Sequence, residues 1–106
     1  MVGHIYFINM PYSDFTKSKG RPVLVFKEID KNDCLVLPLT SNLQREGFLI
    51  TSDDIEDGRI KKESIIVVPK LTAVDSSLII GSKFIASLKK ESFKKVKNQL
   101  CLKLEC

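Results

Sequence analysis

The hydrophobic pattern of the chain predicts a mainly β protein. Runs rich in apolar, aromatic and β-branched residues, typical of strands, occur at 4–10, 22–29, 34–39, 48–51, 64–68 and 84–88. The second and third runs flank Asp30-Lys31-Asn32-Asp33, and Asp and Asn favour tight turns. We therefore expect an antiparallel hairpin there. The 64–68 run is continuously apolar after Ser64, which predicts a central buried strand that Pro69 ends.

The last part of the chain changes period. Phe93, Val96, Leu100 and Leu104 fall at helical spacing, with lysines elsewhere on the wheel. This predicts an amphipathic helix over roughly residues 90–104, packed on a small barrel or curled sheet. The polar segment 13–20 and the acidic segment 52–58 are expected to be loops, and 41–46 a loop or a helical turn.

Composition narrows the class of protein. A chain of 106 residues is expected to form one domain, residues 1–106, whose core needs no metal or disulfide. The net charge of +4 permits a polyanionic partner without requiring one. Its three cysteines lack CxxC spacing, which argues against a disulfide framework and a zinc ribbon, and Cys34 is expected to be buried in a strand. No signal peptide or membrane-length apolar run is evident, so we expect a cytoplasmic protein.

Two polar residues at strand ends are the leading candidates for chemistry. Arg21 precedes Pro22 at the start of one hairpin strand, and Thr40 closes the other. Pro22 disfavours helical geometry at Arg21, so the guanidinium leaves the loop in a preset direction. If the strands are neighbours, the two side chains lie close together. Arginine stabilises phosphate charge and a hydroxyl donates to a phosphoryl oxygen, an arrangement that suits binding a phosphodiester. The alternative is a surface arginine and a threonine that merely ends a strand.

Other features carry weaker signals. The first loop interleaves aromatic residues with lysines, as grooves for single-stranded nucleic acid do, and its candidates are Tyr12, Phe15, Lys17 and Lys19. His4 could serve acid–base chemistry, but a site built on histidines needs two, so we expect a surface residue of an edge strand. Taking Asp53 as the first calcium ligand puts Ser64 where an EF-hand has glutamate, so the acidic turn predicts no metal site. No cofactor is indicated.

Taken in order, several segments resemble the MazF/PemK family of toxin ribonucleases. They are Gly3-His4-Ile5, the 20–25 segment Gly-Arg-Pro-Val-Leu-Val, the 37–42 segment Leu-Pro-Leu-Thr-Ser-Asn, the 58–64 segment Gly-Arg-Ile-Lys-Lys-Glu-Ser, residues 70–75, and residues 88–100 as the closing helix. The chain departs from the family where His4 replaces an acidic residue and where the loop before Arg21 is short. Neither departure affects Arg21 or Thr40.

The resemblance implies an SH3-like antiparallel barrel with a C-terminal helix, and a homodimer. It also implies a metal-independent, sequence-selective endoribonuclease that cleaves single-stranded mRNA and leaves 2′,3′-cyclic phosphate and 5′-hydroxyl ends. The family's catalytic arginine and threonine fall on Arg21 and Thr40. Ser41 and Asn42 of the same matched segment are expected to contact the RNA. A cognate antitoxin is the expected protein partner.

Two alternatives use the same barrel. One is a gyrase poison resembling CcdB, but that branch depends on a tryptophan in its tail and this chain has none. The other is a non-catalytic barrel that binds a nucleic acid or a protein partner, in which Arg21 and Thr40 are structural. RNA binding without product formation would distinguish it from the ribonuclease.

Overall fold

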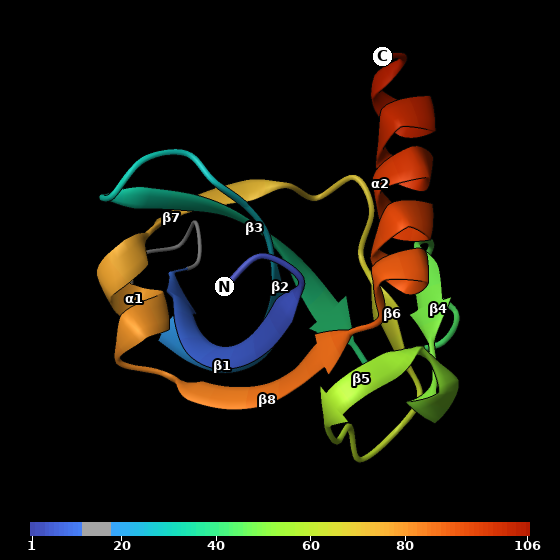
Figure 1. Ribbon diagram of the computed structural model, residues 1–106, viewed down its shortest axis with the longest axis horizontal. Coiled ribbons are helices and arrows are strands. Elements are labelled where there is room, and N and C mark those ends of the chain that lie inside the picture. Colours follow the sequence, from blue (N-terminus) through green and yellow to red (C-terminus); the bar gives the residue numbers. More distant parts are fainter. Residues whose placement is uncertain (12–17) are drawn as a thin grey trace.

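The strands form one curled antiparallel sheet in the computed structural model, which describes residues 1–11 and 18–106 (Figure 1). Its strands are β1 (His4–Pro11), β2 (Ser18–Glu28), β3 (Asp33–Thr40), β4 (Phe48–Ile50), β5 (Ile55–Gly58), β6 (Ser64–Ile66), β7 (Thr72–Asp75) and β8 (Lys83–Leu88). The sheet order is β4-β6-β3-β2-β1-β8-β5, and β7 pairs with β3. A 3₁₀ turn (Ser52–Asp54) and two helices, α1 (Ser76–Ile80) and α2 (Lys90–Leu104), complete the described residues. The mainly β class, with a curled half-barrel and a C-terminal helix, is confirmed.

The predicted hairpin is confirmed as β2 and β3. Their register pairs Val23 with Pro38 and Leu24 with Leu37. In the turn, the Asp30 carboxylate accepts the backbone N–H groups of Asn32 at 2.7 Å and Asp33 at 2.9 Å. These bonds satisfy donors that the turn leaves outside the sheet ladder, which is why an aspartate favours this position.

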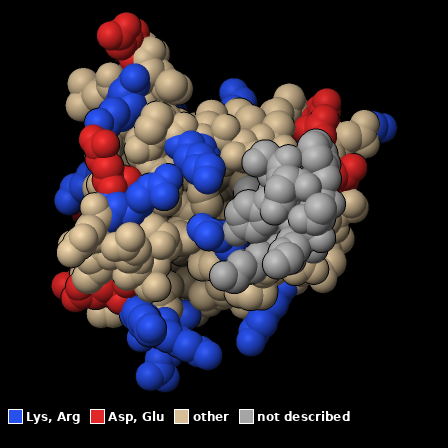
Figure 2. Space-filling model, turned by 180° about the vertical axis from the view of Figure 1, so that it is seen from behind, with Lys and Arg blue, Asp and Glu red and all other residues tan. Residues whose placement is uncertain are grey.

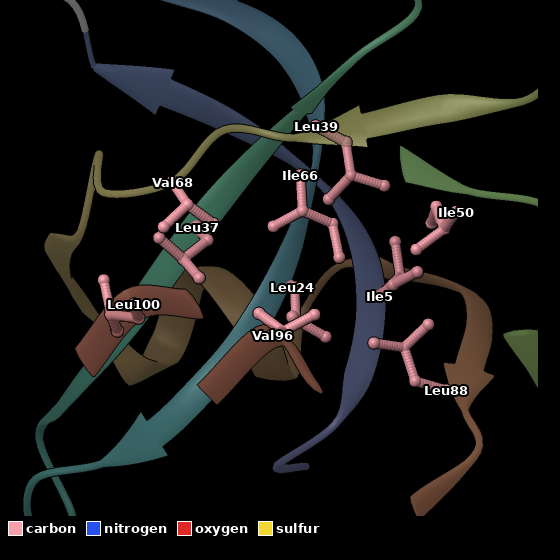
Figure 3. Close-up of a cluster of buried hydrophobic side chains, with 10 residues drawn as sticks. All are labelled: Ile5, Leu24, Leu37, Leu39, Ile50, Ile66, Val68, Leu88, Val96 and Leu100. Carbon is pink, nitrogen blue, oxygen red and sulfur yellow. The ribbon is translucent and has the colours of Figure 1, made fainter. Parts of the chain in front are cut away.

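Two clusters of apolar side chains lie on the two faces of the curled sheet. The larger one packs strand residues against α2 and consists of Ile5, Leu24, Leu37, Leu39, Ile50, Ile66, Val68, Leu88, Val96 and Leu100 (Figure 3). The smaller one lies toward α1 and consists of Ile8, Val23, Val25, Cys34, Val36, Val74 and Ile79. Alternation along β2 sends Val23 and Leu24 to opposite clusters, so this strand is covered on both faces.

Three short elements differ from the sequence prediction. The acidic segment expected to be a loop contains β5, which pairs with β8. The chain also forms β7 against β3 and the short helix α1 after it. Each has only four or five residues, and acidic residues have low strand propensity. Pairing with an existing strand therefore determines β5 and β7. In the same way β2 begins at Ser18, inside the predicted loop, because it pairs with β1. Helix α1 instead begins after its N-cap residue Asp75, whose carboxylate accepts the N–H of Ser77 at 2.9 Å.

Helix α2 follows the predicted boundaries, with one correction to its apolar face. Val96 and Leu100 are buried and Phe93 packs against Phe26, with ring centroids 5.6 Å apart. Leu104, which we expected on this face, is exposed because the helix extends beyond the sheet at its C-terminal end (Figure 1). Near the other end, the hydroxyl of Ser92 donates to the Asp54 carboxylate at 2.7 Å and ties the helix to the 3₁₀ turn.

The cysteines differ in environment. Cys34 is buried, as predicted, with its sulfur 3.2 Å from the Ser76 hydroxyl. Cys101 and Cys106 form a disulfide across the C-terminal end of α2, which the sequence analysis did not predict. The two cysteines are only five residues apart, so this bond closes one helix end and joins no separate elements. Within the described residues, no helix has the length and apolarity to cross a membrane.

Candidate functional site

A cleft of about 750 Å³ lies between the β1–β8 part of the sheet, the end of β3 and the segment that joins β5 to β6. Its lining combines apolar and basic residues: Ile5, Phe7, Arg21, Pro22, Leu39, Thr40, Ser41, Arg59, Ile60, Lys61, Lys62, Ser64, Lys83 and Ile85. Figure 2 views the molecule from behind and shows basic side chains at the lower edge and across the left and centre of that view, with acidic side chains mostly toward its margins. The cleft can therefore hold an anionic ligand.

Arg21 and Thr40 both line this cleft. Each lies two residues beyond the paired residues Val23 and Pro38, Arg21 toward the start of β2 and Thr40 at the end of β3. Both residues are half-buried. The two residues are nineteen positions apart in the sequence and line one cleft beyond this end of the β2–β3 pairing. A guanidinium and a hydroxyl are both hydrogen-bond donors that phosphate oxygens can accept.

The hydroxyl of Thr40 is oriented by the loop that follows. Its oxygen accepts the backbone N–H of Asn42 at 3.2 Å. Because a hydroxyl has one hydrogen and two lone pairs, this bond leaves the hydrogen of Thr40 free to donate to a ligand. The next residue, Ser41, is exposed and also lines the cleft.

The remaining residues that were predicted to contact RNA are not among the residues that line the cleft in the described structure. Asn42 does not line the cleft, and its side-chain oxygen accepts the N–H of Gln44 at 3.1 Å, which stabilises the turn. Lys19 lies in β2 opposite Met10, but its side chain is outside the description. Tyr12, Phe15 and Lys17 lie outside the described residues. RNA contacts by all five residues stay predictions.

Four basic residues of the cleft were not identified as candidates from the sequence. Arg59, Lys61 and Lys62 lie in the segment after β5, and Lys83 begins β8. The N–H of Arg59 donates to the Ile85 carbonyl at 3.1 Å, which extends the β5–β8 pairing into this segment. The run of three cations within four residues was the available signal, but only the fold places it in the same cleft as Arg21.

His4 needs a correction. It lies in β1, an inner strand flanked by β2 and β8, and not at an edge of the sheet. Its ring packs edge-on against Phe84, with centroids 5.5 Å apart, and its Nδ1 lies 3.4 Å from the Tyr6 hydroxyl. Burial lowers the pKa of His4; the positive N-terminus adds to this effect and Asp57 opposes it. His4 is not among the residues that line the cleft.

The acidic turn is structural. Asp54 accepts the N–H of Thr51 at 2.9 Å, and the Thr51 hydroxyl accepts the N–H of Asp53, so the two residues cap the 3₁₀ turn reciprocally. Over residues 1–11 and 18–106, no three His, Cys, Asp or Glu side chains form a group that could hold a metal ion.

Comparison with known proteins defines the family. The model of the PemK-like, MazF-like toxins of type II toxin–antitoxin systems matches residues 1–104. A crystal structure of MazF from Deinococcus radiodurans superposes with a TM-score of 0.71 and 15% sequence identity, over 99% of this chain and 96% of that chain. At this identity the superposition shows the shared fold. Among curated protein sequences, none matches the chain. The match over nearly all of its residues shows that the chain belongs to the PemK-like, MazF-like toxins of type II toxin–antitoxin systems.

Proposed function

We propose that this toxin is an endoribonuclease that cleaves single-stranded mRNA at selected sequences. The 2′-oxygen of the RNA bonds to the adjacent phosphorus while the bond from that phosphorus to the 5′-oxygen breaks. The 2′-oxygen loses its proton and the departing 5′-oxygen gains one from solvent, so the products carry a 2′,3′-cyclic phosphate and a 5′-hydroxyl. The observation that carries the proposal is that Arg21 and Thr40 line one cleft, and that the other charged residues known to line it, within residues 1–11 and 18–106, are all basic. Because the nucleophile belongs to the substrate, this reaction needs alignment and charge stabilisation more than an added nucleophile or a metal.

Arg21 is proposed to stabilise the charge that develops on the phosphorane. An arginine stays protonated in proteins and offers parallel N–H donors that match two phosphate oxygens. The residue is half-buried and Pro22 restricts its backbone, which reduces the ordering needed when the substrate binds. Such a preorganised donor is worth on the order of 10²–10³ in rate.

Thr40 is proposed to donate its hydroxyl hydrogen to a phosphoryl oxygen or to the attacking 2′-hydroxyl. The hydrogen bond from Asn42 to its oxygen supports this role, since it fixes the hydroxyl and leaves the hydrogen to donate. Asn42 would then act through Thr40 as well as through any contact with RNA.

The RNA path is proposed to follow the basic wall of the cleft. Arg59, Lys61, Lys62 and Lys83 supply charge along it, and Ser41 a further polar contact. From the sequence alone, Tyr12, Phe15, Lys17 and Lys19 of the first loop are proposed to extend the path.

Partners follow from the family and from charge. Type II toxins are paired with a cognate antitoxin, and we propose that an acidic segment of it occupies the basic cleft. A homodimer in the cytoplasm is the proposed working form. Sedimentation velocity of the isolated toxin tests the dimer.

The cleavage rate of single-stranded RNA in EDTA tests the function. We expect the wild type to cleave, and Arg21→Ala to cleave about 10²–10³-fold more slowly. Arg45→Ala is the matched control, because Arg45 is exposed and does not line the cleft. Thr40→Val should be slow, whereas Thr40→Ser retains the hydroxyl and should keep most of the activity.

Other outcomes would contradict the proposal. Cleavage undiminished in Arg21→Ala would exclude the assigned site. RNA binding without products would favour the non-catalytic barrel, and loss of gyrase supercoiling without RNA cleavage would favour the gyrase poison.

A further inference from the structure

Phe7 is an aromatic residue that the sequence analysis did not single out. It lies in β1 two residues after Ile5, so both side chains are on one face of the strand. Ile5 is fully buried in the core under α2, whereas Phe7 is 46% exposed and lines the cleft. The apolar surface of the core therefore extends into the cleft, where the ring of Phe7 is accessible to a ligand.

Gly20 gives this ring its position. A Cβ built on Gly20 would overlap the Cε1 and Cζ atoms of Phe7, so the ring lies against the glycine backbone. In the register, Phe7 is opposite Pro22 on one side and Lys83 on the other. A ring seated on a strand glycine between two such neighbours has fewer positions available than a free surface phenylalanine. The pairing of the strands thus determines where the ring lies, opposite Pro22, the residue that follows Arg21.

The surroundings of the ring indicate its ligand. Among the described residues that line the cleft, the charged ones are Arg21, Arg59, Lys61, Lys62 and Lys83, and none is acidic. Sites for single-stranded nucleic acid combine such basic walls with aromatic rings on which bases stack. A volume of about 750 Å³ is within the range of ligand pockets that hold small molecules of nucleotide size.

We propose that Phe7 is a stacking platform for one base of the RNA, the base next to the phosphodiester held by Arg21 and Thr40. This inference rests on the proposed function for the position of that phosphodiester. Stacking of a base on an aromatic ring is sequence-tolerant, and truncating the ring weakens binding by about 5- to 150-fold. Phe7 is a binding residue in this account, and the chemistry remains with Arg21 and Thr40.

The experiment measures binding without cleavage. The probe is a fluorescein-labelled pool of random heptamers of 2′-O-methyl RNA, which lacks the attacking hydroxyl. A second probe is an abasic sugar–phosphate chain of the same length. Anisotropy titrations compare the wild type with Phe7→Leu. We expect Phe7→Leu to bind the base-bearing pool at least fivefold more weakly and to bind the abasic chain as the wild type does.

Phe84→Leu is the matched control. Phe84 is 42% exposed and lies opposite Tyr6, on the other face of the sheet from Phe7. This variant should bind both probes as the wild type does. Gly20→Ala is a second test variant, because its methyl group would displace the ring while the chain keeps Phe7. It should reproduce the selective loss, and thermal melting of each variant checks its folding.

Equal weakening toward both probes, no weakening in Phe7→Leu, or the same loss in Phe84→Leu would overturn the proposal. The cleavage reaction can fail its own test while Phe7 still discriminates between the two probes. A failure of this inference is therefore distinguishable from a failure of the proposed function.

Discussion

Gly58 lies directly against the backbone of Ile85. A Cβ at position 58 would overlap the carbonyl oxygen of Ile85 and lie 2.6 Å from the Cα of Ala86, and Gly58 has a φ of +81°. Both facts require glycine at the end of β5. This contact precedes the segment that carries Arg59, Lys61 and Lys62 into the cleft, so the basic wall depends on it.

Gly58→Ala should therefore destabilise the protein strongly. Overlap with backbone atoms and an unfavourable φ predict a loss of about 2–4 kcal/mol in the free energy of unfolding. Urea denaturation measures it. Gly81→Ala is the control, because Gly81 has a φ of −87° and its added Cβ would lie 3.6 Å from the Ser77 carbonyl oxygen. It should change stability by less than about 1 kcal/mol. Equal effects of the two substitutions would contradict this account of Gly58.

The packing of α2 can be tested with two leucines of the same helix. Leu100 is 4% exposed and lies in the larger core, whereas Leu102 is 80% exposed. Leu100→Ala should lower the free energy of unfolding by about 2–5 kcal/mol because it leaves a cavity. Leu102→Ala should stay within about 0.5 kcal/mol of the wild type. Similar losses at the two positions would mean that the helix does not pack as described.

His4 makes stability depend on pH. Burial holds its folded-state pKa below the ordinary value, so between the two values the unfolded chain binds more protons. The contribution of neutral His4 to the folding stability is therefore present above about pH 6.5, and it is lost as the pH falls through the folded-state pKa. The melting temperature should decrease more between pH 7.5 and pH 5.5 in the wild type than in His4→Gln. The same fall in both proteins would contradict the assignment.

RNA affinity should depend on salt through the basic wall. Each phosphate contact to a single strand contributes about −0.7 to the slope of log K against log salt concentration. Lys83→Gln should make the slope less negative by about 0.7, since Lys83 lines the cleft. Lys94→Gln, on the exposed surface of α2, should leave the slope unchanged. A less negative slope for Lys94→Gln but not for Lys83→Gln would mean that the RNA binds along α2 and not along the cleft.

The sequence was sufficient for the elements whose signals are local. The β2–β3 hairpin has a turn of Asp and Asn between two apolar runs, and α2 has a clear helical period. It was insufficient for β5 and β7, which form by pairing with β8 and β3. In β5 the residues Glu56, Asp57 and Gly58 do not favour strands, and β7 has only four residues, so pairing with a neighbouring strand determines both.

The candidate site divides in the same way. Arg21 and Thr40 could be found because Arg21 precedes the start of one predicted strand and Thr40 closes the other, each within a proline-containing motif. Phe7 and Lys83 could not, because they are 76 residues apart and become neighbours only through the β1–β8 register. Phe7 also lies within a run of apolar residues, so its sequence context does not distinguish it from a residue of a buried strand.

The most direct measurement identifies the ends of the products. A defined single-stranded RNA is incubated with the protein in EDTA and analysed by mass spectrometry. A second RNA has hydrogen in place of the 2′-hydroxyl at the cleaved position. Our account predicts 2′,3′-cyclic phosphate and 5′-hydroxyl ends from the first RNA, and no cleavage at that position in the second. Products with 5′-phosphate ends, or cleavage of the deoxy-substituted RNA, would contradict it.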